Sequence, residues 1–340
     1  MELSFVYPGA TNFDALKRAA ALGDRPDGWP YGINQLAHTG PRGIVSAQEP
    51  TRPTPWSLLR AVSRTGGNTM DEEAVITWDE WTATKELGRP RLPRLASGVI
   101  WLTDKPRTMR DHLRQEFERR ALVRAEALWA LTRPQVDMLP KLLGRGAPPV
   151  DFLKFGIDTN FFAPHPPVGR PTVLSAGGDR DRDAETLFKA LSIVHQRVPD
   201  AQLLVQTNSQ ARPPAGVTLL GHMPHASLRR LYANSTLIAI ATRPNNHVSG
   251  MTVALEAMSS GRPVVMTRTP GVEDYVQDGL TGALTRSSDP IALAEEVVRM
   301  LEHQDEAARL GAAARRYVVK EHSTTVMIDR LDPILGRVGL

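Results

Sequence analysis

The chain contains no cysteine among its 340 residues. This absence excludes disulfide bonds, thiolate metal ligands and a cysteine nucleophile, and it is compatible with a reducing cytoplasm. Long apolar runs are also missing, since no stretch approaches the roughly 20 consecutive apolar residues that span a bilayer. The first ten residues, MELSFVYPGA, lack the basic start and apolar core of a secretory signal. From these absences we expect a soluble, cytoplasmic protein.

A strong net charge is absent as well. The formal net charge is +4, although arginine raises the isoelectric point to about 9.5. A balance this modest does not require a nucleic-acid partner. Residues 85–124 are more basic, with eleven lysines and arginines against five acidic residues. Such a surface suits peripheral contact with an anionic membrane or a phosphorylated acceptor, whereas i,i+4 pairs such as Glu116 and Arg120 favour an ordinary solvated helix face.

The residues that are present describe a globular α/β protein. Hydrophobic residues make up 41% of the chain and charged residues 23%, which excludes a disordered chain, and the length favours two domains. Apolar segments alternate with helical patterns, as in parallel α/β sheets. We predict strands at 3–7, 74–77, 97–103, 171–176, 236–241 and 263–267. We predict helices at 12–22, 105–129, 251–258, 290–302, 305–320 and 324–335, with a loop at 50–72 and a connection beginning at Leu139-Pro140.

One stretch, residues 243–284, carries most of the functional information. Gly250 precedes a run of good helix formers, residues 251–258, and therefore marks a helix start. The N-terminus of a helix carries unsatisfied N–H groups and partial positive charge, so a glycine there lets a diphosphate approach the backbone. Glu256 lies about one and a half turns further along, at roughly 1.5 Å per residue, which matches the span from a diphosphate to a ribose.

The strings LEAMSSGRPVV and GVEDYVQDGLTGAL in this stretch resemble the nucleotide-sugar half of retaining glycosyltransferases of the GT-B fold, specifically family four. The resemblance implies two Rossmann-like, doubly wound parallel-sheet domains that face a central cleft. It implies an acceptor domain at 1–158, a donor domain at 159–320 and a C-terminal helix, 321–340, that returns to the first domain. The competing interpretation is an ordinary helix-to-strand turn of any doubly wound sheet.

The resemblance also implies roles for individual residues. Arg182 and Glu256 are expected to bind the donor phosphates and ribose and to support catalysis. Asp104 stands near the place of a family histidine and is the third catalytic candidate, although it is also a candidate helix N-cap. The further donor-binding candidates are Gly32, Gly178, His222, His247, Ser249, Gly250, Met251 and Thr252.

Three features depart from the family or leave an alternative open. Val248 stands where the family carries a second glutamate, and His247, Ser249 or an asparagine of Asn245-Asn246 is a candidate replacement. Gly32 and His222 are also explained as simple turn residues. The pair Asp179 and Asp181 imitates a metal-binding motif, but its place after a strand favours capping and salt bridges.

The expected activity is transfer of a sugar, with retention, from a nucleoside-diphosphate sugar to a hydroxyl acceptor such as a glycan, glycolipid or natural product. No cofactor and no metal are expected, because the helix start and Arg182 supply positive charge. Two alternatives remain from the sequence: a GT-B sugar-nucleotide epimerase, and a non-catalytic partner subunit that binds nucleotide sugar.

Overall fold

The structure is a computed structural model that describes residues 3–7, 12–38, 45–48, 50–63, 70–166, 169–337 and 339. The chain divides into two compact units. The first comprises Met1–Lys17, Gly28–Phe155 and Met327–Leu340, and the second comprises Arg18–Asp27 and Gly156–Val326. The domain limits 1–158, 159–320 and 321–340 stay predictions. No helix within the described ranges is long and apolar enough to cross a membrane.

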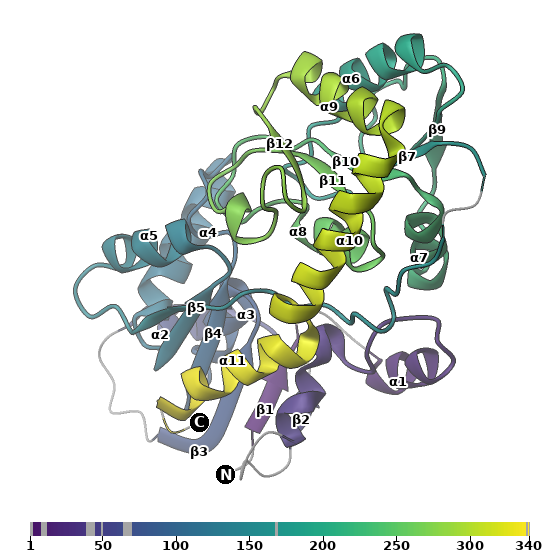
Figure 1. The fold of residues 1–340 in the computed structure, drawn as a ribbon. Coiled ribbons are helices and arrows are strands. Elements are labelled where there is room, and N and C mark those ends of the chain that lie inside the picture. Colours follow the sequence, from purple (N-terminus) through teal and green to yellow (C-terminus); the bar gives the residue numbers. More distant parts are fainter. Residues whose placement is uncertain are drawn as a thin grey trace. The chain divides into compact units, whose positions relative to one another are not determined.

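A parallel sheet organises the first unit, with the described strands in the order β2-β1-β3-β4-β5-β6 (Figure 1). The strands are β1 (Leu3–Val6), β2 (Val45–Gln48), β3 (Met70–Thr77), β4 (Leu92–Val99), β5 (Ala127–Ala130) and β6 (Val150–Phe152). The helices are α1 (Phe13–Ala21), the 3₁₀ helix η1 (Pro30–His38), α2 (Pro55–Val62), α3 (Glu80–Glu86), α4 (Met109–Leu122), α5 (Arg133–Leu143) and α11 (Thr324–Arg337). Both α1 and α11 cross a unit boundary.

The first unit holds its own apolar core between one face of this sheet and helices α2 to α5. Val75 of β3, Leu95 of β4 and Leu128 of β5 pack there with Leu122 and Leu139 from the helices, and all five are at most 1% exposed. Alternate strand residues face the two sides of a sheet. Phe5 of β1, Ile76 of β3 and Trp129 of β5 lie at the alternate positions and are fully buried, so the other face of the sheet is apolar as well.

Two sequence predictions for the first unit are wrong. The helix expected over 105–129 ends at Leu122, and Ala127–Ala130 is instead the buried strand β5. A short, fully buried apolar run has no periodicity that separates strand from helix, which explains the error. Pro140 does not begin a connection but lies inside α5, where Leu139 and Leu143 are buried. Packing of these leucines compensates for the N–H that proline lacks.

The strand predicted at 97–103 also ends early, at Val99. Glu80, which is 1% exposed, explains the end. Its carboxylate accepts hydrogen bonds from the N–H groups of Ile100 and Trp101, at 2.9 and 2.7 Å. These two donors are therefore unavailable to a neighbouring strand. The predicted loop at 50–72 contains another unpredicted element, α2, which begins with a capping box between Thr54 and Ser57.

The second unit is built on another parallel sheet, with the described strands in the order β12-β11-β10-β7-β8-β9 (Figure 1). The strands are β7 (Thr172–Ser175), β8 (Gln202–Gln206), β9 (Val217–Leu220), β10 (Leu237–Ile240), β11 (Val264–Thr267) and β12 (Gly282–Thr285). The helices are α6 (Ala184–Arg197), α7 (His225–Asn234), α8 (Met251–Ser259), the 3₁₀ helix η2 (Val272–Asp274), α9 (Pro290–Glu302) and α10 (Gln304–Glu321).

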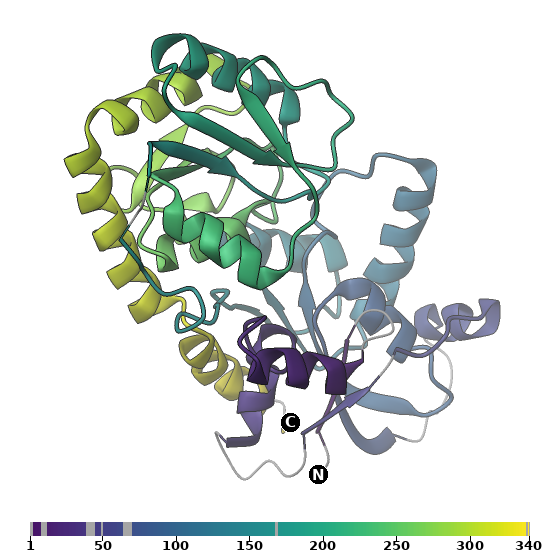
Figure 2. The ribbon, with the colours of Figure 1, turned by 90° about the vertical axis from the view of Figure 1, so that its right-hand side faces the viewer.

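Helices cover both faces of the second sheet, which Figure 2 shows from the side. Helices α6 and α9 share one core with the inward residues of β7, β8 and β10. Helices α7 and α8 pack on the opposite face. From the adjacent central strands β7 and β10 the chain winds outward in opposite directions, so the loops that follow them lie at a topological switch point. Open α/β sheets bind ligands at this place.

The sequence predictions for the second unit hold closely. Strands predicted at 171–176, 236–241 and 263–267 correspond to β7, β10 and β11, and the helix predicted at 251–258 corresponds to α8. Helices α9 and α10 are confirmed as well. The exception is β12, which the predicted strands do not include, because its four residues follow Gly279 in a stretch rich in glycine.

Candidate active site

Gly250 begins the helix α8 at the switch point of the second unit. Its φ of +87° lies in the left-handed region, which glycine adopts without steric cost. No side chain in the described part of the chain caps the helix start. The N–H of Met251 donates to the carbonyl of Val248 at 3.0 Å, so this predicted phosphate donor already has an acceptor. The preceding loop therefore contacts the start of α8 through its backbone, and the first turn of the helix contains no acidic residue.

Arg182 lies against this helix start. A Cβ atom added at Gly250 would lie 3.1 Å from Nη1 of Arg182, and one at Gly177 would lie 2.6 Å from Nη2. The guanidinium therefore occupies the space that two side-chain-free residues leave open. Its Nη2 donates to the carbonyl of Ala176 at 2.6 Å, whereas the buried Nε has no acceptor among the described residues. The structure thus brings Arg182 and Gly250 together, as the sequence predicts.

Glu256 lies in the second turn of α8 and is 7% exposed. The hydroxyl of Tyr232 donates a hydrogen bond to its Oε2 at 2.9 Å. Burial raises the pKa of Glu256 to about 7, while the Tyr232 hydrogen bond and the charge of Arg182 act in the opposite direction. The electrostatic influence of Glu256 also acts on Arg182, whose pKa burial lowers. Glu256 and Arg182 therefore form one electrostatic site.

The loop between β10 and α8 is tied to the loop after β7 by Asp179. The Ser249 hydroxyl donates to Oδ1 of Asp179 at 2.7 Å, and Nε2 of His247 lies 3.6 Å from Oδ2. Burial raises the pKa of Asp179, but contacts with His247, the Asp181 N–H and Ser249 outweigh it and hold this pKa well below its usual range. Asp179 therefore stays ionised and fixes the two loops to each other.

Val248, which replaces the family glutamate, has a φ of +49° and is 2% exposed. A β-branched residue in this region is sterically unfavourable, and such residues cluster at functional sites. The N–H of the next residue, Ser249, donates to the side chain of Asn245 at 2.9 Å. Surrounding hydrogen bonds thus hold the loop in a strained shape. No carboxylate projects from position 248, whatever the loop binds.

The three aspartates after β7 have different partners. Asp179 Oδ1 accepts from the N–H of Asp181 at 2.8 Å, which closes a local turn. Asp181 pairs with Arg180 at 3.3 Å. Asp183 caps α6 by accepting from the N–H of Thr186 at 3.1 Å. These contacts are the capping and ion pairing that the sequence interpretation favours for this segment.

The remaining predicted residues lie in different surroundings. Gly178 lies next to Asn208, whose side-chain N–H₂ donates to its carbonyl at 3.2 Å. His222 is exposed in the loop before α7. Gly32 belongs to the first unit, is buried and has a φ of +64°, next to Tyr31 at +60°. Two consecutive residues with positive φ make a sharp backbone reversal at this position.

Asp104 also belongs to the first unit and lies five residues beyond the end of β4. Its carbonyl accepts from Nε2 of Gln115 at 2.9 Å. The alternative interpretation of Asp104 as a helix N-cap is wrong, because Thr108 caps α4. Asp104 also does not follow directly after a strand, because β4 ends at Val99, where the Glu80 carboxylate accepts the next two backbone N–H groups.

Two residues make contacts at the candidate site that the sequence does not predict, although Asp179 itself is expected to form caps and salt bridges. Tyr232 contacts Glu256, and Asp179 accepts the hydrogen bond of Ser249. Tyr232 is fully buried near the end of α7, at the i+4 position from Leu228, so helical spacing predicts its inward orientation. Its contact with Glu256 depends on the packing of α7 beside α8, which no local pattern encodes.

Residues 170–303 match the family model described as "Glycosyl transferases group 1". This segment spans β7 to the end of α9, so it includes Arg182, Gly250 and Glu256. The second unit thus carries a glycosyl transferases group 1 domain, and the resemblance to glycosyltransferases drawn from its motifs is confirmed at this level.

Two curated relatives are similar over somewhat more of the chain. A D-inositol 3-phosphate glycosyltransferase of Xylanimonas cellulosilytica is 27% identical over 230 residues, covering 58% of this chain and 54% of the relative. A GDP-mannose-dependent monoacylated alpha-(1-6)-phosphatidylinositol monomannoside mannosyltransferase of Corynebacterium glutamicum is 27% identical over 215 residues, covering 55% and 56%. The chain spans about half the length of these curated relatives.

Solved structures match the chain almost end to end. Sucrose-phosphate synthase of Thermosynechococcus elongatus has a TM-score of 0.70 at 16% identity and covers 99% of each chain. HepE of Anabaena in complex with UDP-glucose has a TM-score of 0.68 at 14% identity, covering 99% of this chain and 100% of that one. At such identities the likeness concerns the fold. The chain has the GT-B fold with two Rossmann-like parallel sheets, as the sequence predicts.

Proposed function

We propose that the protein is a glycosyltransferase of family four that moves a sugar from a nucleoside-diphosphate sugar to a hydroxyl acceptor with retention of configuration. The observation that carries the proposal is Arg182, a partly buried arginine whose buried Nε–H has no acceptor among the described residues and which lies at the start of α8. A partly buried cation with an unused N–H attracts an anion, and a helix start adds to this attraction. The matched domain and the names of the relatives support the same activity.

In this proposal the donor diphosphate binds between Arg182 and the start of α8. Negative charge develops on the diphosphate as the bond to the sugar breaks, and fixed donors stabilise that charge without reorganising. Gly250 and Thr252 are proposed to donate their backbone N–H groups to the diphosphate. No metal is required in this proposal, because the protein supplies the positive charge. Gly178 and His222 are the proposed contacts of the phosphates and the nucleobase from the neighbouring loops.

Glu256 is proposed to accept hydrogen bonds from the ribose hydroxyls. With a pKa of about 7, its carboxylate form is only partly populated near neutral pH in the free chain. Two hydroxyl donors stabilise the ionised form, so donor binding and ionisation of Glu256 support each other. Tyr232 orients the carboxylate of Glu256 through the hydrogen bond that its hydroxyl donates to Oε2.

The sugar is proposed to lie near Ser249 and His247, whose side chains face Asp179. The first unit, with Gly32 and Asp104, is proposed to bind the acceptor. Its basic region 85–124 is less available for a membrane than its charge suggests. Arg119 and Arg120 both pair with Glu116, at 2.8 and 2.6 Å, and Arg114 pairs with Glu118 at 2.7 Å. These pairs favour a solvated helix face over a membrane contact.

Binding of nucleotide sugars is the first experiment. Thermal unfolding is measured with UDP, GDP, dTDP and ADP sugars, since a ligand at 100 times its dissociation constant stabilises by about 2.7 kcal/mol. The nucleotide sugar that stabilises the protein is then incubated with the protein, with and without a panel of acceptors. Transfer supports the proposal. Isomerised sugar in the absence of acceptor identifies an epimerase, and binding without turnover identifies a nucleotide-sugar-binding partner, for which the loss of the glutamate at Val248 would be the reason.

A further inference from the structure

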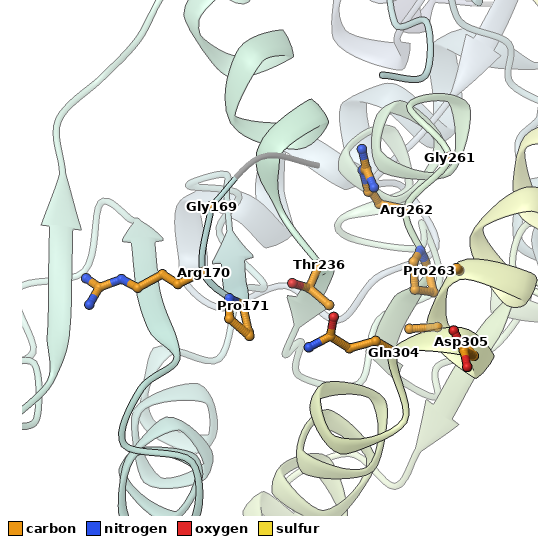
Figure 3. Close-up of a pocket in the computed structure, with 11 residues that line it drawn as sticks. Gly169, Arg170, Pro171, Thr236, Gly261, Arg262, Pro263, Gln304 and Asp305 are labelled. Atoms are coloured by element: carbon orange, nitrogen blue, oxygen red, sulfur yellow. The ribbon is translucent and has the colours of Figure 1, made fainter. Parts of the chain in front are cut away.

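A polar cavity lies at the amino-terminal ends of the strands of the second unit, whereas the proposed donor site lies at their carboxyl ends. Its volume is about 310 Å³, and it opens among the residues that precede strands of the second unit (Figure 3). Pro171 precedes β7, Thr236 precedes β10 and Pro263 precedes β11. The loops around Arg182 and Gly250 follow the same strands at their carboxyl ends. The cavity and the donor site are therefore separated by the length of the strands.

Arg262 gives this cavity an unusual charge. It lines the cavity and is 7% exposed. Its Nη2 donates to the carbonyls of His165 and Ala233, but its buried Nε has no acceptor among the described residues. No carboxylate of the described chain pairs with it, and burial alone lowers its pKa. Buried charges are normally paired, so this cation lacks the anion that would compensate it.

Helix α10 begins at the same cavity. Gln304 and Asp305 are its first residues and line the cavity, and none of the described side chains caps this helix start. Helix starts favour anions through their unsatisfied N–H groups. Thr236 adds a hydroxyl that accepts from the Thr172 N–H at 3.0 Å and keeps its own proton for donation. The one acidic side chain in the lining, Asp305, is exposed and offsets part of the positive charge.

Figure 3 shows how these groups are arranged. Gln304 extends from the start of α10 toward Thr236 and Pro171, and the side chain of Arg262 lies above them. The side chain of Arg170 extends away from the cavity and does not contribute its charge there. The donors at the cavity are therefore Thr236, Gln304 and the start of α10, whereas Arg262 contributes positive charge from the wall, because its Nε is buried and its Nη2 donates to two carbonyls. This set suits a compact oxyanion with several acceptor oxygens.

We propose that the cavity binds a small phosphate-class oxyanion, either inorganic phosphate or the phosphate group of a small ester. The site lies on the second unit alone and does not depend on the proposed sugar transfer. A volume near 310 Å³ holds a phosphate together with a small attached group. The ligand supplies the missing counter-charge of Arg262 and satisfies the first N–H groups of α10.

The test measures binding of sodium phosphate and of glycerol 3-phosphate to the full-length protein by calorimetry, at ionic strength matched with sodium chloride. We expect one saturable site, and the tighter of the two ligands identifies the class that the cavity prefers. Gln304→Glu adds a carboxylate at a helix start that tolerates one, so the fold is kept while like charge weakens binding by about tenfold or more. Gln196→Glu, on exposed α6 surface, changes the net charge equally and should leave the affinity unchanged.

Further variants separate this site from the donor site and from a merely structural role of Arg262. Phosphate binding should persist in Arg182→Met and in the presence of a saturating nucleoside diphosphate. Arg262→Lys keeps the positive charge and should largely retain binding, whereas Arg262→Met removes the charge and should weaken binding. Absence of saturable phosphate binding to the wild-type protein overturns the proposal. Loss of that binding in Arg182→Met, or its displacement by nucleotide, also overturns it, because the anion then occupies the donor site.

Discussion

The loops after β7 and β10 in the second unit differ from the connection after β4 in the first unit in what holds them. In the second unit, backbone hydrogen bonds join the two loops. The N–H of Arg243 donates to the carbonyl of Asp181 at 2.8 Å, and the N–H of Asp183 donates to the carbonyl of Ala241 at 2.9 Å. In the first unit, side chains from helices hold the backbone, as when Gln135 donates to Ile100 O at 2.7 Å. Backbone geometry restricts residue types, whereas a side-chain contact can come from many sequences.

This difference explains why the second unit has recognisable motifs. A loop shaped by its own backbone needs glycine where φ is positive, as at Gly177 and Gly250. The connection after β4 needs only a carboxylate from Glu80 and amides from α4 and α5. Predictions that alter one unit and spare the other test whether function is divided in the same way.

The largest effect is expected at Arg182. Replacing it with methionine removes the positive charge at the start of α8, and loss of one preorganised donor lowers turnover by about 10²–10³-fold. Stability should fall modestly, because the hydrogen bond to the Ala176 carbonyl and the favourable charge beside Asp179 and Glu256 are lost. Sugar transfer and nucleotide affinity are the measurements. Arg180→Met, on the exposed neighbour, is the control, and near-normal transfer by R182M would contradict the proposed role.

The next largest effect compares buried glutamates of the two units by pH. Burial raises the pKa of Glu256 to about 7, and burial together with Glu80 raises the pKa of Glu118 to about 8 against the opposing charge of Arg114. A folded pKa above the unfolded value of about 4.3 means that each neutral carboxyl stabilises the fold fully below that value. This contribution, up to about 3 kcal/mol for Glu256, is lost as the pH rises through the folded pKa.

Glu256→Gln and Glu118→Gln should therefore each reduce the fall in melting temperature between pH 5 and 8. Only Glu256→Gln should also weaken nucleotide binding, because it removes the negative charge and replaces one of the two oxygens proposed to accept from the ribose with an N–H₂ donor. Thermal scans across pH and nucleotide titrations check both statements. Equal loss of nucleotide affinity in the two variants would mean that the units do not divide the function in this way.

A smaller effect is expected from alanine at two glycines. At Gly250 an added Cβ meets Ile240 Cγ2 at 2.8 Å and forces a side chain into positive φ, and at Gly98 of β4 it meets the carbonyl of Trp78 at 2.5 Å. Each substitution should lower the free energy of unfolding by about 1–3 kcal/mol. Gly250→Ala should also lower nucleotide affinity, whereas Gly98→Ala should not. Denaturant unfolding and nucleotide titration separate the two outcomes.

The smallest effect is expected from Ser249→Ala. It removes a hydrogen bond to the ionised Asp179 and costs about 1–2 kcal/mol, mainly in the ordering of the loop over α8. The Michaelis constant for the donor should therefore rise by several-fold with little change in kcat. Ser287→Ala removes an exposed hydroxyl that bonds to a carbonyl at 2.8 Å and serves as control. An unchanged Michaelis constant in S249A would show that Asp179 does not position the loop.

The sequence predicted the elements around the switch point, because glycine, helix-forming runs and buried strands are local signals, whereas the expected place of Arg182 at the phosphate site came from the family resemblance. It did not predict the contact of Tyr232 with Glu256 or of Asp179 with Ser249, which join residues 24 and 70 positions apart. It also mistook Ala127–Ala130 for helix, because a strand buried on both faces lacks alternation. Long-range packing, rather than weak local preference, accounts for these errors.

The backbone of Val248 has a consequence for folding. Its left-handed conformation is one that an isolated peptide of this sequence avoids, at a cost of about 1–3 kcal/mol. The segment therefore adopts its shape only after the neighbouring loop supplies Asp179, so it should be among the last parts of the second unit to order and the first to open. Hydrogen exchange at Ser249 should then report local opening well before the strands of the sheet exchange.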